Sequence, residues 1–284
     1  MKHITVIIPC YNEAESIGAV IAAFPREKLL RYGLELEILV VDNNSKDNTA
    51  TLAAAAGARV ITELRQGKGH AIRAGFDAIS SATDYVVMLD GDDTYRPEEI
   101  MRLIEPIDSG FCNVVIGSRL AGHISDGSMR PFNRLGNWMF SHLVRYAYQV
   151  NVTDVLTGYF AWSRAAVMQL RPHLESEGFA IEMEMITKMA RLGQAIYSVP
   201  ISYHSRLGES SLSPIGDGSR ILAMYLSNLK WLPETSTTVH AGAAGATSVA
   251  GHQRWNRSGN RRATNFYESL DTRTHHSRKS GARP

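Results

Sequence analysis

Short apolar runs alternate with amphipathic segments along the first half of the chain. The apolar runs predict strands at Ile4–Ile8, Leu36–Val41, Arg59–Thr62, Tyr85–Leu89 and Asn113–Ile116. The segments between them carry apolar residues at helical spacing, which predicts helices at Glu13–Phe24, Asp47–Ala56, Gly69–Ile79 and Pro97–Ile107. Continuously apolar strands that alternate with helices predict an α/β fold, with a mostly parallel central sheet covered by helices on both faces.

The pattern is different in the second half. A long helix is predicted over Pro131–Val150, and a second helix over Ile181–Leu192 leads into a strand at Ala195–Val199. The segment Arg220–Leu232 predicts an amphipathic helix. Its aromatic and basic residues suit a membrane interface, and packing on the protein body explains the apolar stripe equally well.

Composition divides the chain at Pro233. Beyond this residue Thr, Ser, Gly and Ala dominate, followed by Arg, His and Asn, with few large apolar groups. Such a segment buries too little to offset the entropy of ordering it, so residues 233–284 are predicted to be a disordered tail. Residues 1–232 are predicted to form one domain, with a first half at 1–120 and a second half at 121–232.

Charge is distributed unevenly between these parts. The tail holds eight Lys and Arg against three Asp and Glu, so the body is mildly acidic although the whole chain carries +2. An acidic body argues against nucleic acid as a partner. No signal peptide precedes the first strand and no apolar run is long enough to span a bilayer, which predicts a cytoplasmic protein that is soluble or lies on a membrane surface.

Polar clusters follow three of the predicted strands. They are Tyr11-Asn12-Glu13, Asp42-Asn43-Asn44-Ser45 and Asp90-Gly91-Asp92-Asp93. Ligands of parallel α/β sheets bind at the carboxyl ends of the strands. Three clusters at such ends therefore predict one shared binding site.

Asp90 and Asp92 predict a metal site within this region. Two carboxylates at positions i and i+2 of an extended segment point to the same side. They repel each other unless a cation lies between them, and a hard divalent ion such as Mg²⁺ or Mn²⁺ prefers oxygen ligands. Such an ion also binds the phosphates of a nucleotide. Gly67-Lys68-Gly69, at a predicted helix start, offers backbone N–H groups and a cation to phosphate.

The motifs together carry a resemblance to a known family. Pro9 to Glu13, Val40 to Thr49, Gly67 to Ala71, Leu89 to Tyr95 and Gly117-Ser118-Arg119 resemble family 2 glycosyltransferases of the GT-A fold. In the second half the resemblance is to the dolichol-phosphate mannosyltransferase branch. Its motifs are Asp154 to Gly158, Gly178-Phe179 with Glu182 to Met185, Val199-Pro200-Ile201, and Arg206 to Ser210. The resemblance spans Ile4 to Leu232.

This resemblance implies roles for individual residues. Binding of the nucleotide-sugar is implied for Pro9, Tyr11, Glu13, Val41, Asp42, Asn43, Lys68, Asp90, Gly91, Asp92 and Thr94. Asp42 and Asn43 are expected at the base and ribose, although relatives often carry two Asp there, which leaves the base open. Asp90 and Asp92 are expected to hold Mg²⁺ or Mn²⁺, with Thr94 where relatives often have Gln. The ion acts as a Lewis acid on the leaving diphosphate.

A second set of residues is implied for catalysis and the acceptor. Asp92, Asp154, Glu184 and Arg206 are the expected catalytic residues, and an acceptor phosphate is expected at Arg119, Arg134, Arg206 and Ser210. Guanidinium groups bind phosphate with paired hydrogen bonds. Asp154 or Glu184 would be the general base for a sugar hydroxyl, whereas a lipid phosphate is already ionised. Ser211 stands where relatives usually have Lys, so the loop lacks that cation.

The implied activity is transfer of a hexose from GDP-mannose or a UDP-hexose to a polyprenyl or dolichyl phosphate, with inversion. The protein would then lie peripherally on the cytoplasmic face of the membrane. Two other functions stay open: transfer to a soluble glycan, and sugar-nucleotide binding without catalysis. A Rossmann dehydrogenase is disfavoured because no Gly-x-Gly-x-x-Gly follows the first strand. The oligomeric state is not predicted.

Overall fold

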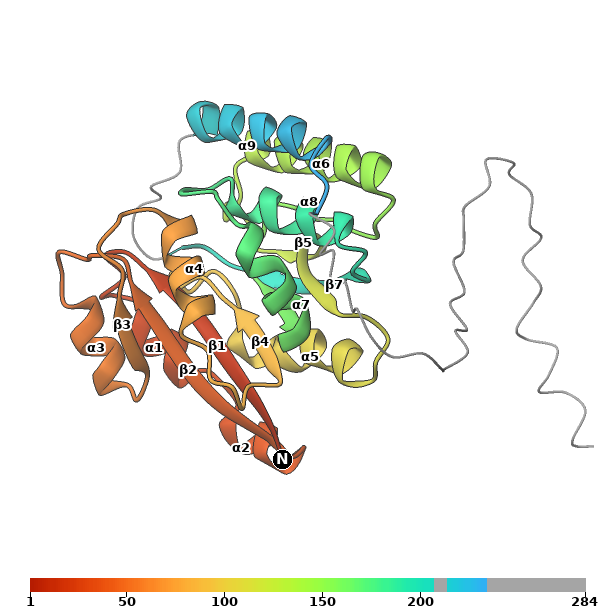
Figure 1. Ribbon diagram of the computed structural model, residues 1–284. Coiled ribbons are helices and arrows are strands. Elements are labelled where there is room, and N and C mark those ends of the chain that lie inside the picture. The colour runs from red at the N-terminus through yellow and green to blue at the C-terminus, as the bar shows by residue number, and fades with distance from the viewer. Residues whose placement is uncertain (207–213, 234–284) are drawn as a thin grey trace, which may run out of the picture. The chain divides into compact units, whose positions relative to one another are not determined.

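A central sheet organises the computed structural model, which describes residues 1–206 and 214–233 (Figure 1). The described strands are β1 (Lys2–Cys10), β2 (Leu34–Asp42), β3 (Arg59–Thr62), β4 (Tyr85–Met88), β5 (Val114–Ile124), β6 (Phe160–Ser163) and β7 (Ile196–Tyr203). Their order across the sheet is β3-β2-β1-β4-β6-β5-β7. Neighbouring strands are parallel except where β6 pairs antiparallel with β4 and β5. The predicted mostly parallel α/β sheet is confirmed.

The apolar strands serve two cores because successive side chains point to opposite faces of the sheet. Along β1, Ile7 enters the core on one face while Val6 and Ile8 enter the core on the other. All three side chains are completely buried. This double burial explains why the strands read as continuous apolar runs rather than as an alternation.

Helices cover both faces of the sheet and close these cores (Figure 1). One core is closed by α1 (Ile17–Ala22), α2 (Arg26–Arg31), α3 (Thr49–Ala55) and α5 (Ile100–Asp108), with the 3₁₀ turn η1 (Pro97–Glu99) before α5. The other is closed by α4 (Lys68–Asp77), α6 (Pro131–Tyr148), α7 (Arg164–Leu170), α8 (Ile181–Arg191) and α9 (Pro214–Asn228), with the 3₁₀ turn η2 (Arg171–His173) after α7. The result is a three-layer arrangement of helices, sheet and helices.

Three predictions about the elements are wrong in detail. The segment Phe160–Ser163 is the strand β6, which the sequence analysis does not predict and which lies between β4 and β5. The final helix is α9 at Pro214–Asn228, so it is shifted towards the N-terminus relative to the predicted Arg220–Leu232. The predicted helix Glu13–Phe24 contracts to α1, because residues 11–16 form the loop that follows β1. The predicted disordered tail lies outside the described residues, apart from Pro233.

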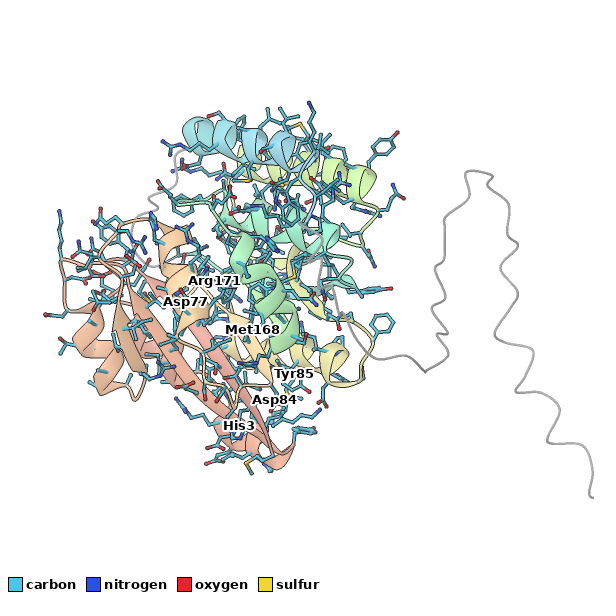
Figure 2. All side chains as sticks on the ribbon, in the orientation of Figure 1. His3, Asp77, Asp84, Tyr85, Met168 and Arg171 are labelled. Carbon is cyan, nitrogen blue, oxygen red and sulfur yellow. The ribbon has the colours of Figure 1, made fainter. Side chains whose placement is uncertain are left out.

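The two ends of the sheet differ in character. At the amino ends, the His3 backbone N–H donates to the Asp84 carboxylate at 2.8 Å and the Tyr85 hydroxyl donates to Asp108 at 2.6 Å (Figure 2). An ion pair between Asp77 and Arg171 joins α4 to η2. The carboxyl ends instead carry the polar loops. No helix in the described part of the chain has the length and apolar character to cross a membrane.

Candidate active site

Three strand-end loops meet at one edge of the sheet. Strands β1, β2 and β4 are parallel neighbours, so the loops that follow them emerge side by side. The backbone N–H of Asn43 donates to the Cys10 carbonyl at 2.8 Å, and the Ser16 hydroxyl donates to the Gly91 carbonyl at 2.7 Å. These bonds join the loop after β2 and the loop after β4 to the β1 loop. The polar residues predicted from three separate segments therefore share one region.

Asp42, the last residue of β2, and Asn43, the residue after it, differ in their hydrogen bonding. Asp42 is 6% exposed, and its Oδ1 atom has no hydrogen-bond partner among the described residues. An unpartnered buried carboxylate oxygen is costly unless a ligand satisfies it. Asn43 is also buried, but its amide donates to the carbonyls of Glu63 and Arg65 and accepts from the Gly67 N–H at 2.7 Å. Asn43 thus fixes the loop before α4, whereas Asp42 is available to a ligand.

Three other predicted nucleotide contacts differ in access. Tyr11 is 37% exposed and Val41, in β2, is completely buried. Pro9, at the end of β1, is partly exposed. A contact through the Val41 side chain would require the ligand to enter the core, so Tyr11 and Pro9 are the more accessible of the three.

Lys68 lies between two carboxylates at the start of α4. Its Nζ is 2.7 Å from Asp90 Oδ1 and 2.6 Å from Glu182 Oε1. Burial opposes the charge, but Asp90 and Glu182 together raise the pKa of Lys68 above its usual range. Burial raises the pKa of Glu182, an effect that Lys68 partly offsets. The Lys68 ammonium is thus largely buried between two carboxylates. Asp90 comes from the loop after β4 in the first half of the chain, and Glu182 comes from α8 in the second half.

Glycine allows the closest approach to this group. A Cβ atom on Gly158 would lie 2.0 Å from Asp90 Oδ2, so any larger residue at this position would displace the Asp90 carboxylate. Gly158 belongs to the loop before β6, so its lack of a side chain lets the second-half motif pack directly on the Asp90 carboxylate.

Arg206 joins Asp92 to Glu13 across the site. Its Nη2 donates to Glu13 Oε1 at 2.6 Å, and its Nη1 is 3.4 Å from Asp92 Oδ2. The other Asp92 oxygen accepts from the Thr94 hydroxyl at 2.6 Å. Burial raises the pKa of Glu13 to about 7 despite Arg206, and burial together with Asp90 raises the pKa of Asp92. Acids crowded in this way need additional positive charge.

The acids of the site fit a divalent cation. Four carboxyl groups, those of Glu13, Asp90, Asp92 and Glu182, lie around only two cationic side chains, Lys68 and Arg206. No group of three or more potential ligand residues able to hold an ion exists among residues 1–206 and 214–233. Magnesium is commonly bound by one or two carboxylates, with substrate phosphates and water completing its shell. Asp90 and Asp92 therefore fit an ion that binds together with a diphosphate.

Asp154 is held away from solvent by Arg119. The carboxylate is completely buried and accepts from Arg119 Nε at 2.8 Å, Arg119 Nη2 at 2.9 Å and Asn137 at 2.6 Å. Burial alone would raise its pKa, but Arg119 and Asn137 hold the pKa of Asp154 below its usual value. A carboxylate with a depressed pKa is a weak base. The geometry is better suited to holding β5 and α6 in place than to proton transfer. The hydrogen bonds to Asp154 also occupy the Arg119 guanidinium.

Glu184 is likewise fully engaged inside the protein. It is completely buried, pairs with Lys188 at 2.7 Å, and accepts from the backbone N–H groups of Glu175 and Ser176 at 2.9 and 2.8 Å. The loop that it fixes contacts the start of α4, because the Gly69 N–H donates to the Glu177 carbonyl at 2.8 Å. Glu184 therefore stabilises the loop at residues 175–177, which in turn contacts the start of α4 beside Lys68. This geometry does not favour a role for Glu184 as general base.

One expected phosphate ligand lies away from the site, and another is outside the described residues. Arg134 is exposed on α6, and no contact joins it to the cluster of acids in the described part of the structure. Ser210, with Ser211, lies outside the described residues. Glu182 belongs to one of the sequence motifs but is not among the predicted site residues. Its signal was present, because a helix turns positions i and i+2 to nearly opposite sides, so only one of Glu182 and Glu184 can face Lys68.

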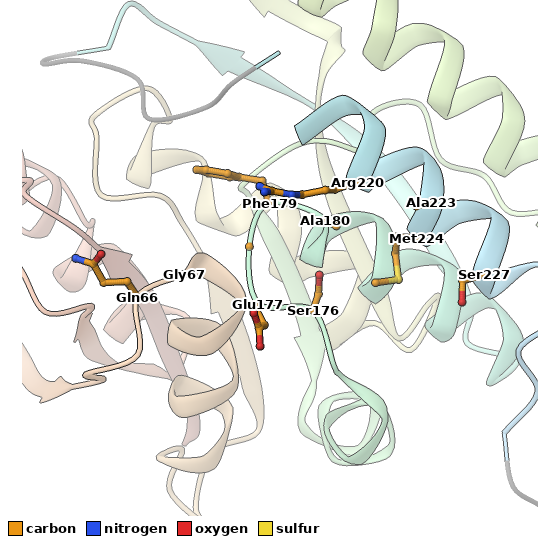
Figure 3. Close-up of a pocket in the computed structure, with 11 residues that line it drawn as sticks. Gln66, Gly67, Ser176, Glu177, Phe179, Ala180, Arg220, Ala223, Met224 and Ser227 are labelled. Atoms are coloured by element: carbon orange, nitrogen blue, oxygen red, sulfur yellow. The ribbon is translucent and has the colours of Figure 1, made fainter. Parts of the chain in front are cut away.

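A pocket of about 610 Å³ adjoins the Lys68 loop (Figure 3). Its wall comes from Gln66 and Gly67 before α4, from residues 176–180 before α8, and from α9. Phe179 and Met224 supply apolar surface, and Arg220 supplies a cation at the same opening. The pocket thus combines an apolar wall with the Arg220 guanidinium, which lies 3.2 Å from Asp217, and it adjoins the Lys68 loop through Gly67.

The fold and this site define a sugar transferase of the GT-A class. A solved structure of glucosyl-3-phosphoglycerate synthase from Mycobacterium tuberculosis, in complex with Mn²⁺, UDP-glucose and glycerol 3-phosphate, is 25% identical with a TM-score of 0.63. The match covers 82% of each chain.

The family follows from sequence. Residues 5–171 match the model of glycosyl transferase family 2, and the chain belongs to this family. Glycosyltransferase AglJ of Haloferax volcanii is 32% identical over 87% of this chain and 78% of its own length. The dolichyl-phosphate hexose transferase of the same organism is 32% identical over 77% of this chain and 90% of its own. The predicted family, branch and enzyme class are confirmed.

Proposed function

We propose that this glycosyltransferase transfers a hexose from GDP-mannose or a UDP-hexose to a polyprenyl phosphate, with inversion and with Mg²⁺ or Mn²⁺ as cofactor. The observation that carries the proposal is the cluster at the strand ends, where four carboxyl groups lie around two cationic side chains, Lys68 and Arg206. The four acids are Glu13, Asp90, Asp92 and Glu182. The relative named as a dolichyl-phosphate hexose transferase supports the acceptor, and the neighbour solved with Mn²⁺ and UDP-glucose supports the cofactor and donor type.

On the donor side, the buried Asp42 oxygen accepts from a base N–H or a ribose hydroxyl. Lys68 presents its ammonium to the diphosphate, and Asp90 and Asp92 would hold a divalent metal ion. The ion, when bound, stabilises the negative charge that develops on the departing diphosphate. Glu182 keeps Lys68 aligned through its 2.6 Å contact.

On the acceptor side, an ionised phosphate needs no general base. Its oxygen attacks the anomeric carbon as the bond from that carbon to the nucleoside diphosphate breaks, and the electron pair leaves with the diphosphate. This chemistry agrees with Asp154 and Glu184, whose carboxylates are both fully hydrogen-bonded inside the protein. Arg206 and Arg220 are the cations proposed to orient the acceptor phosphate, with its first apolar units against Phe179 and Met224.

The proposal is tested by transfer of radiolabelled sugar from a panel of GDP- and UDP-sugars to a short polyprenyl phosphate. Label is expected in the lipid phase with Mn²⁺ or Mg²⁺ and not with EDTA. Asp92→Asn is expected to lower kcat by at least about a hundredfold, since a metal ligand is lost from the transition state.

The matched control is Asp93→Asn, one residue away. Asp93 has a φ of 61°, which Asn tolerates, and its Arg96 partner lies 4.0 Å away. It is expected to keep nearly full activity. Equal activity of Asp92→Asn and wild type would refute the metal assignment. Transfer to a soluble glycan or a small phosphorylated acceptor, with none to lipid, would refute the lipid acceptor alone.

A further inference from the structure

Helix α6 turns an apolar face towards solvent. Its exposed large hydrophobic residues are between 47% and 84% accessible, and they are Phe132, Leu135, Trp138, Met139 and Tyr146. Their spacing of three, four and seven residues places them along one side of the helix. A row of this kind on a water-facing helix marks a surface that binds a partner.

The opposite side of α6 packs on the protein. Asn137, Phe140, Ser141 and Val144 are buried, and Phe140 and Val144 belong to the hydrophobic core. The helix therefore has two apolar sides, and only one is used within the described part of the chain. The fold alone accounts for the inner side and leaves the outer one unexplained.

The charged residues of α6 itself are all positive. Helix α6 contains Arg134 and Arg145 and neither Asp nor Glu, and Arg130 immediately precedes it. All three arginines are exposed. An interfacial helix binds anionic lipid through this combination of apolar, aromatic and basic residues.

Helix α9, the neighbour of α6, also exposes apolar residues. Helix α9 lies beside α6 (Figure 1), where the Tyr225 hydroxyl contacts the Leu143 carbonyl at 3.4 Å. Its Leu222 and Leu226 are 41% and 53% exposed. Helix α9 also lines the pocket through Ala223 and Met224. Helix α9, which lines the pocket, thus packs against α6, whose outer side is apolar.

We infer that the outer side of α6 is a docking surface for a membrane that contains anionic phospholipid. A second copy of the chain fits less well, because a two-fold interface on this side would bring arginines of like sign together with no acid on the helix to pair with them. Docking here holds the pocket close to the lipid phase. The inference extends the proposed function, which supplies the reason for membrane binding, but its test uses neither donor nor acceptor.

The test is flotation of the full chain with vesicles of phosphatidylcholine alone or with 30% phosphatidylglycerol, a fraction on the order of that in anionic cell membranes. Binding is expected to be stronger to the anionic vesicles and to weaken with salt. Leu135→Ser combined with Trp138→Ser is expected to lower the partition coefficient at least about tenfold, because two interfacial apolar groups are lost. Arg130→Gln with Arg145→Gln is expected to remove most of the preference for anionic vesicles.

The matched control is Leu30→Ser with Tyr32→Ser, which removes an equally exposed pair beside α2. This variant is expected to bind vesicles like wild type. Vesicle binding by the α6 variant equal to wild type would overturn the inference, as would a wild-type dimer in light scattering that the α6 variant abolishes. Sugar transfer to a detergent-dispersed acceptor is measured in parallel: its absence in wild type refutes the proposed function and leaves the docking result standing.

Discussion

Glu182 and Glu184 lie two positions apart on α8 and have different surroundings. Glu182 reaches Lys68 in the candidate active site, while Glu184 pairs with Lys188 and the loop at residues 175–176. The sequence motif offers both carboxylates equally, and the sequence analysis selects Glu184. Helical geometry allows only one of these two carboxylates to face Lys68. Which one does so depends on the rotational orientation of α8 against its neighbours, which is a property of tertiary packing.

This difference gives a prediction for Glu182→Gln. Removing one of the two acids that hold Lys68 weakens a charge-assisted contact, so KM for the donor is expected to rise about tenfold, with kcat changed less. Steady-state kinetics and nucleotide titration without acceptor measure both quantities. Glu184→Gln is the control and is expected to lower thermal stability more than donor affinity. A larger loss of kcat than of donor affinity in Glu182→Gln would point instead to a direct catalytic role.

At the scale of elements, the sequence predicts the first half of the sheet well. Strands β1, β2 and β4 are largely buried and read as apolar runs, whereas the edge strand β3 is only partly buried. β3 has the predicted bounds, and β1, β2 and β4 differ only at their ends. β6 escapes prediction because it is four residues long and follows the irregular Asp154 to Tyr159 segment. Its antiparallel pairing depends on a chain reversal that periodicity does not report.

The same limit applies to the faces of helices and to partners distant in sequence. The sequence of the last helix suits a membrane interface and packing on the protein body equally well. In the structure α9 buries Ile221 and Tyr225 and exposes Leu222 and Leu226, while α6 exposes Trp138. An amphipathic stripe shows that a helix has a preferred side, yet the protein's packing decides which side meets solvent. Likewise, the contact of Arg206 with Glu13 joins residues 193 positions apart.

The start of α4 depends on a backbone contact that only glycine allows. A Cβ atom on Gly69 would lie 2.0 Å from the Ser176 carbonyl oxygen, which is backbone and cannot rotate away. Gly69→Ala is therefore expected to lower the free energy of unfolding by about 1–3 kcal/mol and to weaken donor binding through displacement of Lys68. Urea denaturation and nucleotide titration measure the two effects. Gly136→Ala in α6, where no atom lies within 4 Å, is expected to be neutral or stabilising. Equal stability of the Gly69 variant and wild type would contradict the close approach.

For the whole molecule, the Asp154 ion pair makes stability dependent on pH. Asp154 joins Arg119 in β5 to Asn137 in α6, and its pKa is lowered in the folded protein. An acid with a depressed folded pKa stabilises the fold above its unfolded pKa of about 4, and this contribution is lost as the pH falls towards the folded value. Urea midpoints measured from pH 7 down to pH 3 are expected to fall most steeply below about pH 4.

Variants separate this ion pair from other acids. Asp154→Asn leaves the buried Arg119 without its counter-charge, so a loss of about 3–5 kcal/mol is expected at pH 7, together with a flatter dependence on pH below 4. Arg119→Met combined with Asp154→Leu is expected to recover much of the stability, because neither charge is then buried alone. Asp126→Asn, at an exposed position, is the control and is expected to follow wild type throughout. If Asp154→Asn keeps the acid dependence of wild type, the pair does not control acid unfolding, and protonation of other carboxylates must do so.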